Sequence, residues 1–392
     1  MSKIIRGYRY QIYPTNEQAK QLDTFTNLFR KVYNWGIETE LKVYEQYKQG
    51  LSKYGFYTDK ELYSLLTIER NKPENEWLRE LPMCTGRLAL RNVYHAFKSF
   101  FKQKSNFPRF KSKKHSKLSF NTRNDRFSIK NDSIRIEGFK TRISLGFESR
   151  LNFDKVIDPV ISKDTLGNYY VSFSLEEESK ELDIPKTEGI GIDLGDRRTF
   201  TLSTGEIYNQ PKEKLDKLER KSKIQQRHVT RDRKRREAEA KRTIAKYEDI
   251  PKSKRAIKRE LRLNKIYKKI HNIKDTFYHT ITKQIVMRNP KFVCMETFSV
   301  TQIQKREPYS SQYLYKTSFY DITQKMKDKC NTYNIPFIQA PIDYPSTKMC
   351  NNCGHVKNMN SKHVYKCPNC GMVEDRDINA AINLMNYGSQ FI

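Results

Sequence analysis

The sequence of 392 residues contains no hydrophobic run as long as the roughly 18 residues that a membrane-spanning helix needs. Its first residues, MSKIIRGYRYQIYPT, include no continuous apolar segment of the kind found in secretory signals. It also shows no internal repeat and no low-complexity tail. These absences argue against a membrane-embedded or secreted protein, so we expect a cytoplasmic protein. The length of the chain allows two or three domains and a large core.

Cysteine is scarce, with seven residues in the chain. Three of them, Cys84, Cys294 and Cys330, are scattered and odd in number, which argues against a disulfide framework. In a reducing compartment we expect these three to be inert, buried thiols. The remaining four form two Cys-x2-Cys pairs separated by 13 residues, which is the spacing of a metal site: Cys350, Cys353, Cys367 and Cys370.

These two cysteine pairs lie in the similar sequences CNNCGH and CPNCGM. Each tight turn places two thiolates on one side, and two turns together supply the tetrahedral set of four thiolates that zinc prefers. Gly354 and Gly371 allow the chain to turn back toward the sulfur atoms. We therefore predict one structural Zn²⁺, because four thiolates leave no open position for catalysis. Two redox pairs are the alternative, and the repeated glycine disfavours it.

Basic residues greatly outnumber acidic ones. The chain has 75 lysines and arginines, 45 aspartates and glutamates, and a formal net charge of +30. A surface this positive usually binds a polyanion. Aromatic residues make up 12% of the chain, so rings are available beside the cations. This composition favours a partner with phosphates and stackable bases, although a ribosomal or other structural RNA-binding protein would share it.

The positive charge is concentrated in two tracts. Residues 211–275 hold 25 lysines and arginines against 10 acids, and residues 98–118 hold eight lysines and arginines with no acid and four interleaved phenylalanines. A solvated charged helix and a localisation signal are the alternatives, but such an excess favours phosphate contacts. The residues predicted to bind nucleic acid are Arg109, Lys111, Lys113, Lys114, Arg231, Arg233, Lys234, Arg235 and Arg236.

The pattern of apolar residues divides the first half of the chain into three stretches. Residues 3–13 alternate like a strand, residues 14–103 have helical spacing, and residues 104–185 alternate again with the period of β-strands. The first strand is expected to join the later β-rich region, which makes the helical region an insertion.

From residue 186 the expected elements alternate between strands and helices. Three strands precede a long polar helical stretch at 211–287, and a strand, a helix and a strand follow it. The cysteine insert at 341–373 and a closing helix complete the order. This order indicates a mixed α/β domain formed by residues 186–340 and 374–392.

Three acidic residues stand at the edges of elements in this α/β region: Asp193 after GIGI, Glu296 in CMETFSV and Asp377 before INAAINL. Each acid also has an ordinary alternative role. Asp193 could be a strand-to-turn aspartate or the aspartate of an actin-like ATPase, and Glu296 could form an internal ion pair or end a strand. Asp377 could cap the last helix. Ala380 and Ala381 would let the last helix pack closely on the sheet. Together the acids match the carboxylate cluster that two Mg²⁺ ions need, so we predict that they meet and hydrolyse phosphodiesters.

The combination of GIDLGDRRTFTLSTG, VCMETFSV, the four-cysteine insert and DRDINAAINL resembles the TnpB proteins of insertion sequences, which are relatives of the type V CRISPR nucleases. FPRFKSKK resembles their N-terminal half, so the resemblance covers essentially the whole chain. It implies an RNase H-like (RuvC) nuclease domain in three segments, with Asp193, Glu296 and Asp377 as its metal-binding catalytic carboxylates. It also implies a zinc-ribbon insert.

For the N-terminal half, the resemblance implies a wedge-like, β-barrel-like domain from residues 1–13 and 104–185, with a helical recognition domain at 14–103. It further implies an RNA-guided DNA endonuclease of an insertion sequence. Its partners would be a guide RNA made from the transposon end and double-stranded target DNA beside a short recognised motif, with sequence reading delegated to base pairing. We expect a monomer within this ribonucleoprotein, in the bacterial cytosol or nucleoid.

Lys274 stands at a position where the resemblance implies an arginine. Lysine keeps the positive charge but lacks the planar, bidentate hydrogen-bonding geometry of the arginine guanidinium. Two other functions remain open. Nuclease-inactive relatives that act as RNA-guided repressors, or as transposition accessory proteins, lose one or more of the acids, whereas all three are present here. A cut-and-paste transposase would bind transposon ends without RNA.

The charge of the chain predicts a steep salt dependence of nucleic acid binding. Each neutralised phosphate releases counterions, so affinity for RNA should fall roughly a thousandfold between about 50 and 200 mM salt. Fluorescence anisotropy with a labelled RNA across this range measures the effect. An affinity that hardly changes with salt would contradict the predicted phosphate contacts.

Overall fold

The computed structural model describes residues 3–113, 116–130, 132–146, 156–195, 198–244, 246–297, 318–358 and 363–392, without the side chain of Glu248. The chain forms two compact units. The N-terminal unit comprises Ile5–Glu176, and the C-terminal unit comprises Glu177–Ile392 together with Met1–Ile4. Of the residues predicted to bind nucleic acid, Lys114 lies outside the described ones.

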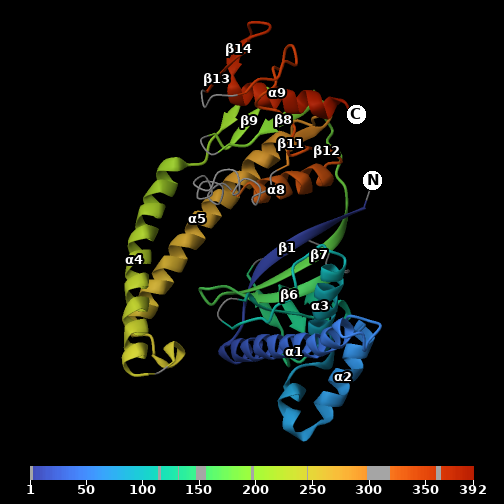
Figure 1. Cartoon of the computed structure of the whole chain (residues 1–392), viewed down its shortest axis with the longest axis vertical. Coiled ribbons are helices and arrows are strands. Elements are labelled where there is room, and N and C mark those ends of the chain that lie inside the picture. The colour runs from blue at the N-terminus through green and yellow to red at the C-terminus, as the bar shows by residue number, and fades with distance from the viewer. Residues whose placement is uncertain are drawn as a thin grey trace. The chain divides into compact units, whose positions relative to one another are not determined.

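The N-terminal unit packs helices against one seven-stranded sheet (Figure 1). Its elements are β1 (Lys3–Tyr13), α1 (Asn16–Lys48), α2 (Asp59–Asn71), η1 (Pro73–Glu80), α3 (Met83–Phe101), β2 (Leu118–Asn121), η2 (Asn124–Arg126), β3 (Phe127–Lys130), β4 (Ser133–Ile136), β5 (Ile143–Leu145), β6 (Val156–Lys163) and β7 (Tyr169–Glu178). The sheet order β2-β6-β7-β1-β5-β4-β3 places β1 between strands of the later region. The expectation that the first strand joins that region is therefore confirmed.

The sequence Pro14-Thr15 with Glu17 downstream predicts a helix start, and α1 begins directly after Thr15. The Thr15 side chain accepts the N–H of Gln18 at 3.3 Å, and the Gln18 side chain accepts the N–H of Thr15 at 2.9 Å. This reciprocal pair satisfies two donors that the first helical turn leaves unpaired. Gln18, rather than the acid Glu17, completes the cap. The Gln18 amide also donates to the Arg142 carbonyl at 3.1 Å, which connects the helix to β5.

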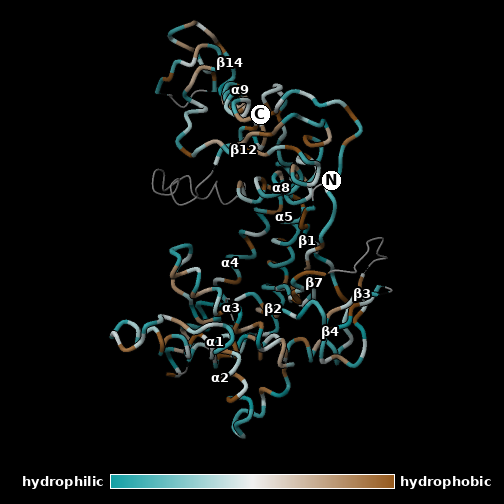
Figure 2. The backbone as a smooth tube through the Cα atoms, turned by 90° about the vertical axis from the view of Figure 1, so that its right-hand side faces the viewer, coloured by the Kyte–Doolittle hydropathy of each residue, from teal (hydrophilic) through white to brown (hydrophobic). Residues whose placement is uncertain are grey.

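One hydrophobic core joins the helices and the sheet of this unit. Leu22 and Phe97 from the helices are buried in the same cluster as Phe120 and Val171 from the strands. Figure 2 shows hydrophobic residues, in brown, at β7, whose alternation buries every second side chain. The helical residues 14–103 and the strands therefore fold around a shared interior.

The C-terminal unit alternates strands and helices as its sequence indicates. Its elements are β8 (Ile190–Asp193), β9 (Phe200–Leu202), β10 (Ile207–Tyr208), α4 (Lys212–Arg242), η3 (Tyr247–Asp249), α5 (Lys254–Val286), β11 (Val293–Glu296), α8 (Phe319–Thr332), β12 (Phe337–Ala340), β13 (Val364–Lys366), β14 (Val373–Asp375) and α9 (Arg376–Ser389). Its main sheet has the order β10-β9-β8-β11-β12, with β8–β10 antiparallel and β8, β11 and β12 parallel. Strands β13 and β14 form a small separate sheet in the cysteine insert.

The two faces of the main sheet are covered by different helices (Figure 1). Side chains alternate along a strand, so Ile192 and Met295 enter a core shared with α5 and α8. Cys294 points the other way and packs in a cluster with Leu384 of α9. Helix α9 therefore covers one face, and α5 and α8 cover the other.

Helix α9 lies unusually close to strand β8. A Cβ atom added at Gly191 would lie 2.0 Å from the Ala381 carbonyl oxygen and 2.4 Å from the Met385 nitrogen. Ala380 and Ala381 are fully buried in this contact. The close packing predicted from the two alanines is confirmed, and Gly191 supplies the other half of it.

Helices α4 and α5 form a long hairpin (Figure 1). An ion pair of 3.0 Å between Arg259 and Asp232 joins them. Arg236 is only 7% exposed, and its guanidinium donates to the Ile250 carbonyl at 2.9 Å and to the Tyr247 hydroxyl at 3.0 Å. These donors hold the turn of the hairpin, so we remove Arg236 from the predicted nucleic acid surface.

Two of the three isolated cysteines match the expectation of inert thiols. Cys294 and Cys330 are buried, and burial raises the pKa of each to about 12. Cys84 is only partly buried. In the described part of the chain, no helix combines the length and the hydrophobicity that crossing a membrane requires.

The contact at Gly191 predicts a severe effect of a single methyl group. Gly191→Ala should lower the free energy of unfolding by about 1–3 kcal/mol or more, because the methyl group meets the backbone of α9. Gly7→Ala is the matched control, since a Cβ there has no neighbour within 4 Å. Thermal unfolding of both variants decides the matter; equal stability would mean that α9 is not held against β8 in this way.

Candidate functional site

Asp193 and Glu296 end two neighbouring parallel strands. Ile192 of β8 pairs with Met295 of β11, so one further step in this register places Asp193 beside Glu296. Adjacent strands lie about 4.8 Å apart. Because side chains alternate, both acids follow onto the face that α9 covers. Two carboxylates separated by about a hundred residues of sequence thus become neighbours.

Asp377 reaches the same place from α9, as its second residue. The N-cap is Asp375, whose carboxylate accepts the N–H groups of Asp377 at 3.0 Å and of Ile378 at 3.3 Å. The alternative that Asp377 itself caps the helix is therefore wrong, because the helix begins one residue before it. The Asp377 carboxylate is consequently available for another role.

The three acids are close enough to affect one another electrostatically. Burial, followed by the negative charges of Asp377 and Glu296, raises the pKa of Asp193 to about 8. Burial alone raises the pKa of Glu296 to about 7. Desolvation and like charges both disfavour the ionised carboxylates. A nearby cation would reverse this effect, so the arrangement has the electrostatic character of a cation site.

Two arginines hold the first turn of α9. Arg198 donates to Asp375 at 2.7 Å and lies 3.7 Å from Asp377. Arg376 donates to one oxygen of Asp377 through Nε at 3.0 Å and Nη2 at 2.9 Å. Arg198 therefore ties the segment after β8 to the helix cap and limits the movement of Asp377 relative to Asp193. Our sequence reasoning missed Arg198 and Asp375, although Arg198 lies five residues after Asp193 and Asp375 lies two residues before Asp377.

Carboxylate oxygen is the ligand that hard divalent cations such as Mg²⁺ prefer, so the residue types fit. Among the described residues, however, only the four cysteines bring three or more ligand atoms within 4.8 Å of one another. The three acids are therefore neighbours that do not converge on one point. Two ions about 3.5–4 Å apart spread their ligands over a wider space, which is compatible with this arrangement.

The four cysteines have the geometry of a tetrahedral metal site. The Sγ atoms of Cys350 and Cys370 are 3.7 Å apart, and those of Cys353 and Cys367 are 3.6 Å apart. In a tetrahedron with Zn–S bonds of about 2.3 Å, sulfur atoms are about 3.8 Å apart. The cluster can therefore bind a metal ion such as zinc, as its spacing predicts.

The two cysteine turns have the same construction. The N–H of Gly354 donates to the Cys350 carbonyl at 2.9 Å, and the N–H of Gly371 donates to the Cys367 carbonyl at 3.2 Å. Both glycines have positive φ, +71° and +74°, a conformation that other residues rarely adopt. This confirms why a glycine follows each pair.

Each turn also supplies a donor to the other. The Asn352 amide donates to Cys370 Sγ at 3.5 Å, and the Asn369 amide donates to Cys353 Sγ at 3.6 Å. The backbone amide of Met372, followed by the Asn352 side chain, lowers the pKa of Cys370 to about 6. Because the thiolate is the form that binds metal, these donors favour metal binding at neutral pH.

Two buried asparagines attach the cysteine insert to α9. Asn379 donates to the Met349 carbonyl at 2.8 Å, and its carbonyl oxygen accepts the N–H of Asn351 at 3.0 Å. Asn383, one turn later, donates to the carbonyls of Ser346 at 2.8 Å and Met349 at 2.7 Å. The segment that leads into Cys350 is thus bound along the helix that carries Asp377. Our sequence reasoning assigned no role to these asparagines.

The predicted nucleic acid residues differ in exposure. Arg109 and Lys113 are exposed. Lys111 is partly buried, with its Nζ 3.8 Å from the centre of the Tyr33 ring, and burial lowers its pKa. Of the predicted residues on α4, the exposed ones are Arg231, Arg233, Lys234 and Arg235.

Comparison with known proteins agrees with the resemblance. A family model described as the Cas12f1-like TNB domain matches residues 319–384, and an IS605 OrfB model described as a helix-turn-helix domain matches residues 1–49. A Streptomyces pristinaespiralis protein named "Putative RNA-guided DNA endonuclease" is 26% identical, over 99% of this chain and 90% of its own. Escherichia coli K12 InsQ has the same description and is 22% identical, over 98% of this chain and 93% of its own.

A structure entitled "Cryo-EM structure of the Cas12f1-sgRNA-target DNA complex" shares the fold, with a TM-score of 0.56 and 14% identity, over 95% of this chain and 83% of that one. These matches show that the chain is similar to the TnpB-like family. Within residues 3–49, the structure places one strand, β1, and one continuous helix, α1. The helix-turn-helix description therefore does not match the elements found there.

The cysteine cluster predicts a structural zinc whose effect reaches α9 through the two asparagines. Cys367→Ser should lower the bound zinc, make residues 345–375 protease-sensitive and speed hydrogen exchange in α9. Cys84→Ser is the control, since Cys84 lies outside the cluster. Metal analysis and limited proteolysis test this; unchanged zinc content and protease resistance in Cys367→Ser would refute it.

Proposed function

We propose that this protein is an RNA-guided DNA endonuclease of an insertion sequence. The observation that carries the proposal is the proximity of Asp193, Glu296 and Asp377 at the ends of β8 and β11 and the start of α9. The names of the relatives support the guided-nuclease class, and the fold shared with the Cas12f1 protein is compatible with it.

The C-terminal sheet, in this proposal, is an RNase H-like (RuvC) nuclease domain. Three antiparallel strands followed by two parallel ones support this assignment. Residues 341–373 would be a zinc-ribbon insert with one structural Zn²⁺, and their attachment to α9 gives this insert a role in placing Asp377.

Each acid has a defined task in the proposed reaction. Asp193 and Glu296 bind divalent cations from the sheet, and Asp377 binds them from α9. When bound, two Mg²⁺ ions would lower the pKa of the attacking water and neutralise the leaving 3′ oxygen. The burial of Asp193 strengthens its attraction for a cation, because the local dielectric is low. Arg198 is a positioning residue, since it holds the α9 cap.

The partners follow from the same proposal. A guide RNA from the transposon end pairs with target DNA, and a short motif beside the target is read by protein. Residues 1–13 and 104–185 would form the wedge-like part, and residues 14–103 the recognition part. The exposed cations of α4 suit phosphate contacts. The ribonucleoprotein would contain one copy of the chain.

Cleavage by the purified ribonucleoprotein tests the proposal. With Mg²⁺ and target DNA, Asp193→Ala should cut more than about a thousandfold more slowly than wild type, because a catalytic ligand is lost. RNA and target binding should persist. Asp343→Asn is the control, since Asp343 is an exposed acid in the same unit.

Two other outcomes would reject the proposal. If Asp193→Ala cut as fast as wild type, the acid cluster would not be the active site. If wild type bound guide and target without cutting, the protein would be an RNA-guided repressor or transposition accessory protein.

A further inference from the structure

Arg376, the first residue of α9, brings a guanidinium to the acid cluster. Its Nε and Nη2 atoms both donate to Oδ1 of Asp377, at 3.0 and 2.9 Å. The other oxygen of this carboxylate, Oδ2, lies 3.7 Å from Nη1 of Arg198. Both oxygens of Asp377 therefore already face a positive charge, which is unexpected for a residue proposed to bind divalent cations.

The charge of Arg376 also acts on Asp193. Burial, followed by the charges of Asp377 and Glu296, raises the pKa of Asp193, and the charge of Arg376 opposes that rise. Within the described residues, neither Asp193 nor Glu296 has an ion-pair partner of its own. Arg376 therefore lies within electrostatic reach of two of the three acids.

The backbone of Arg376 is fixed, whereas its side chain is not buried. Its N–H donates to the His363 carbonyl at 2.8 Å, next to the pairing of Val364 with Asp375 between β13 and β14. The side chain is 29% exposed, and in the part of the chain that the structure describes its hydrogen-bond partner is Asp377. The guanidinium can therefore leave Asp377 while the start of α9 stays in place.

A guanidinium and a divalent cation compete for the same oxygen of Asp377. A carboxylate oxygen offers about two lone-pair sites, and Oδ1 uses both for Arg376. A cation can bind at Oδ1 only after the guanidinium withdraws. At Oδ2 it would still be repelled, and a doubly charged ion is repelled twice as strongly as a singly charged one at the same distance. Arg376 therefore disfavours cation binding at either oxygen.

Support of a metal-binding carboxylate is the alternative role for Arg376, because outer hydrogen bonds often orient such ligands. Arg198 fits this role better, since it donates to Asp375 at 2.7 Å and stays 3.7 Å from Asp377. Arg376 instead places two donors on one oxygen. The two roles have opposite effects: a supporting arginine strengthens cation binding, and a competing one weakens it.

We propose that Arg376 is an internal counter-ion of the acid cluster, which occupies Asp377 in the metal-free protein and so lowers the affinity of the cluster for divalent cations. The inference rests on the proposed function, because it takes the three acids as the ligands of those cations. Two properties follow from it. The acids can lie side by side without a metal, because one charge is compensated within the chain. The site also fills only at a higher cation concentration than the acids alone would require.

Binding of Mn²⁺ to the full-length chain with its zinc bound, without RNA or DNA, tests this role. Mn²⁺ prefers the same oxygen ligands as Mg²⁺, and electron paramagnetic resonance measures the unbound ion. Arg376→Gln and Arg376→Met should each bind Mn²⁺ about tenfold more tightly than wild type, because a neutral side chain removes the like charge beside the ligands.

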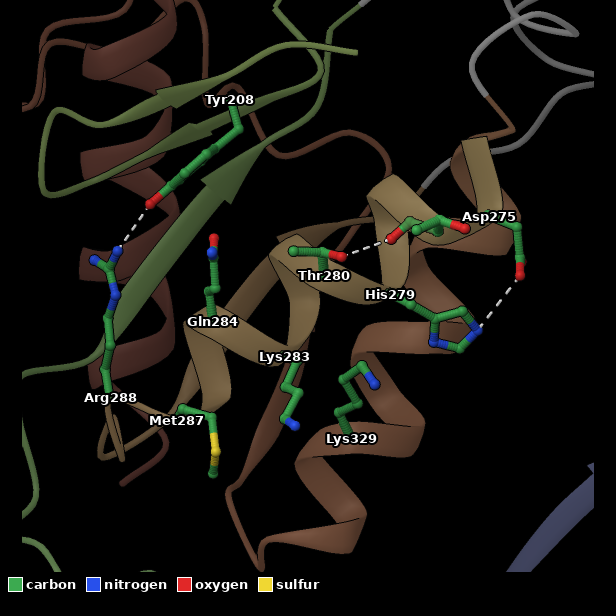
Figure 3. A pocket seen from close by; sticks show the side chains of 10 residues that line it. Tyr208, Asp275, His279, Thr280, Lys283, Gln284, Met287, Arg288 and Lys329 are labelled. Carbon is green, nitrogen blue, oxygen red and sulfur yellow. Dashed lines mark hydrogen bonds and ion pairs between the residues drawn. The ribbon is translucent and has the colours of Figure 1, made fainter. Parts of the chain in front are cut away.

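Arg288→Gln is the matched control. Arg288 lines the pocket between α5, α8 and β10, on the sheet face opposite α9, and Figure 3 shows its hydrogen bond of 2.9 Å to the Tyr208 hydroxyl. It also pairs with Glu206 at 3.0 Å. This variant therefore likewise loses one positive charge and one arginine–carboxylate pair, yet its Mn²⁺ affinity should equal that of wild type.

A double variant separates competition at Asp377 from a general loss of charge. When Asp377→Asn has removed the contested carboxylate, adding Arg376→Gln should raise Mn²⁺ affinity by about threefold or less, because effects of residues in contact are not additive. The small remaining gain would come from the repulsion near Asp193.

Unchanged or weaker Mn²⁺ binding by the folded Arg376 variants would overturn the inference. So would an equal gain in Arg288→Gln, or an undiminished gain in the Asp377→Asn background. Thermal unfolding establishes that the variants are folded, and two neutral replacements of Arg376 guard against the failure of one. If Mn²⁺ binding tightens as expected but the ribonucleoprotein does not cut, the role of Arg376 stands and the proposed function fails. If guided cutting depends on Asp193 but Mn²⁺ binding does not tighten, the proposed function stands and this inference fails.

Discussion

The geometry of the candidate active site depends on the direct contact between the backbone of α9 and strand β8 at Gly191. Any side chain at this position would push the helix away, because a Cβ atom would lie 2.0 Å from the Ala381 carbonyl. Asp193 ends the strand and Asp377 lies in the first turn of the helix, so the closeness of these two elements sets the closeness of the two acids. The Arg198–Asp375 ion pair fixes the helix at its start, and Asn383 ties it to the cysteine insert about two turns later.

Through this arrangement the cysteine cluster affects the position of Asp377 without contacting the acids. A metal ion held by four thiolates would fix the two cysteine turns, and the asparagines transmit that order to α9. The C-terminal unit thus places its acids through three kinds of interaction: close packing, one ion pair, and hydrogen bonds from the insert. The cost of burying Asp193 is met by this rigid frame and would be offset by a divalent cation.

Composition indicated a nucleic acid partner, but exposure and pairing decide which cations can meet it. Arg236 belongs to the run RDRKRRE, yet its guanidinium closes the α4–α5 hairpin, whereas Arg231, Lys234 and Arg235 in the same run are exposed. The density of charge along the sequence is therefore a poor guide to the cations that contact a partner, because helix phase and tertiary contacts determine which side chains are exposed.

The sequence by itself determined the elements whose signals are local. The spacing of four cysteines, the alternation of strands and the start of α1 depend on residues only a few positions apart, and the structure agrees with each. Proximity of the three acids was an inference from chemistry, because no local signal brings residues 193, 296 and 377 together. The Asp375 cap of α9 is also a local contact, although the sequence patterns favoured Asp377. Tertiary structure alone decided that Arg198 holds this cap and that asparagines join the insert to the helix. Those contacts join segments distant in sequence, and their geometry exists only after the sheet and α9 have packed.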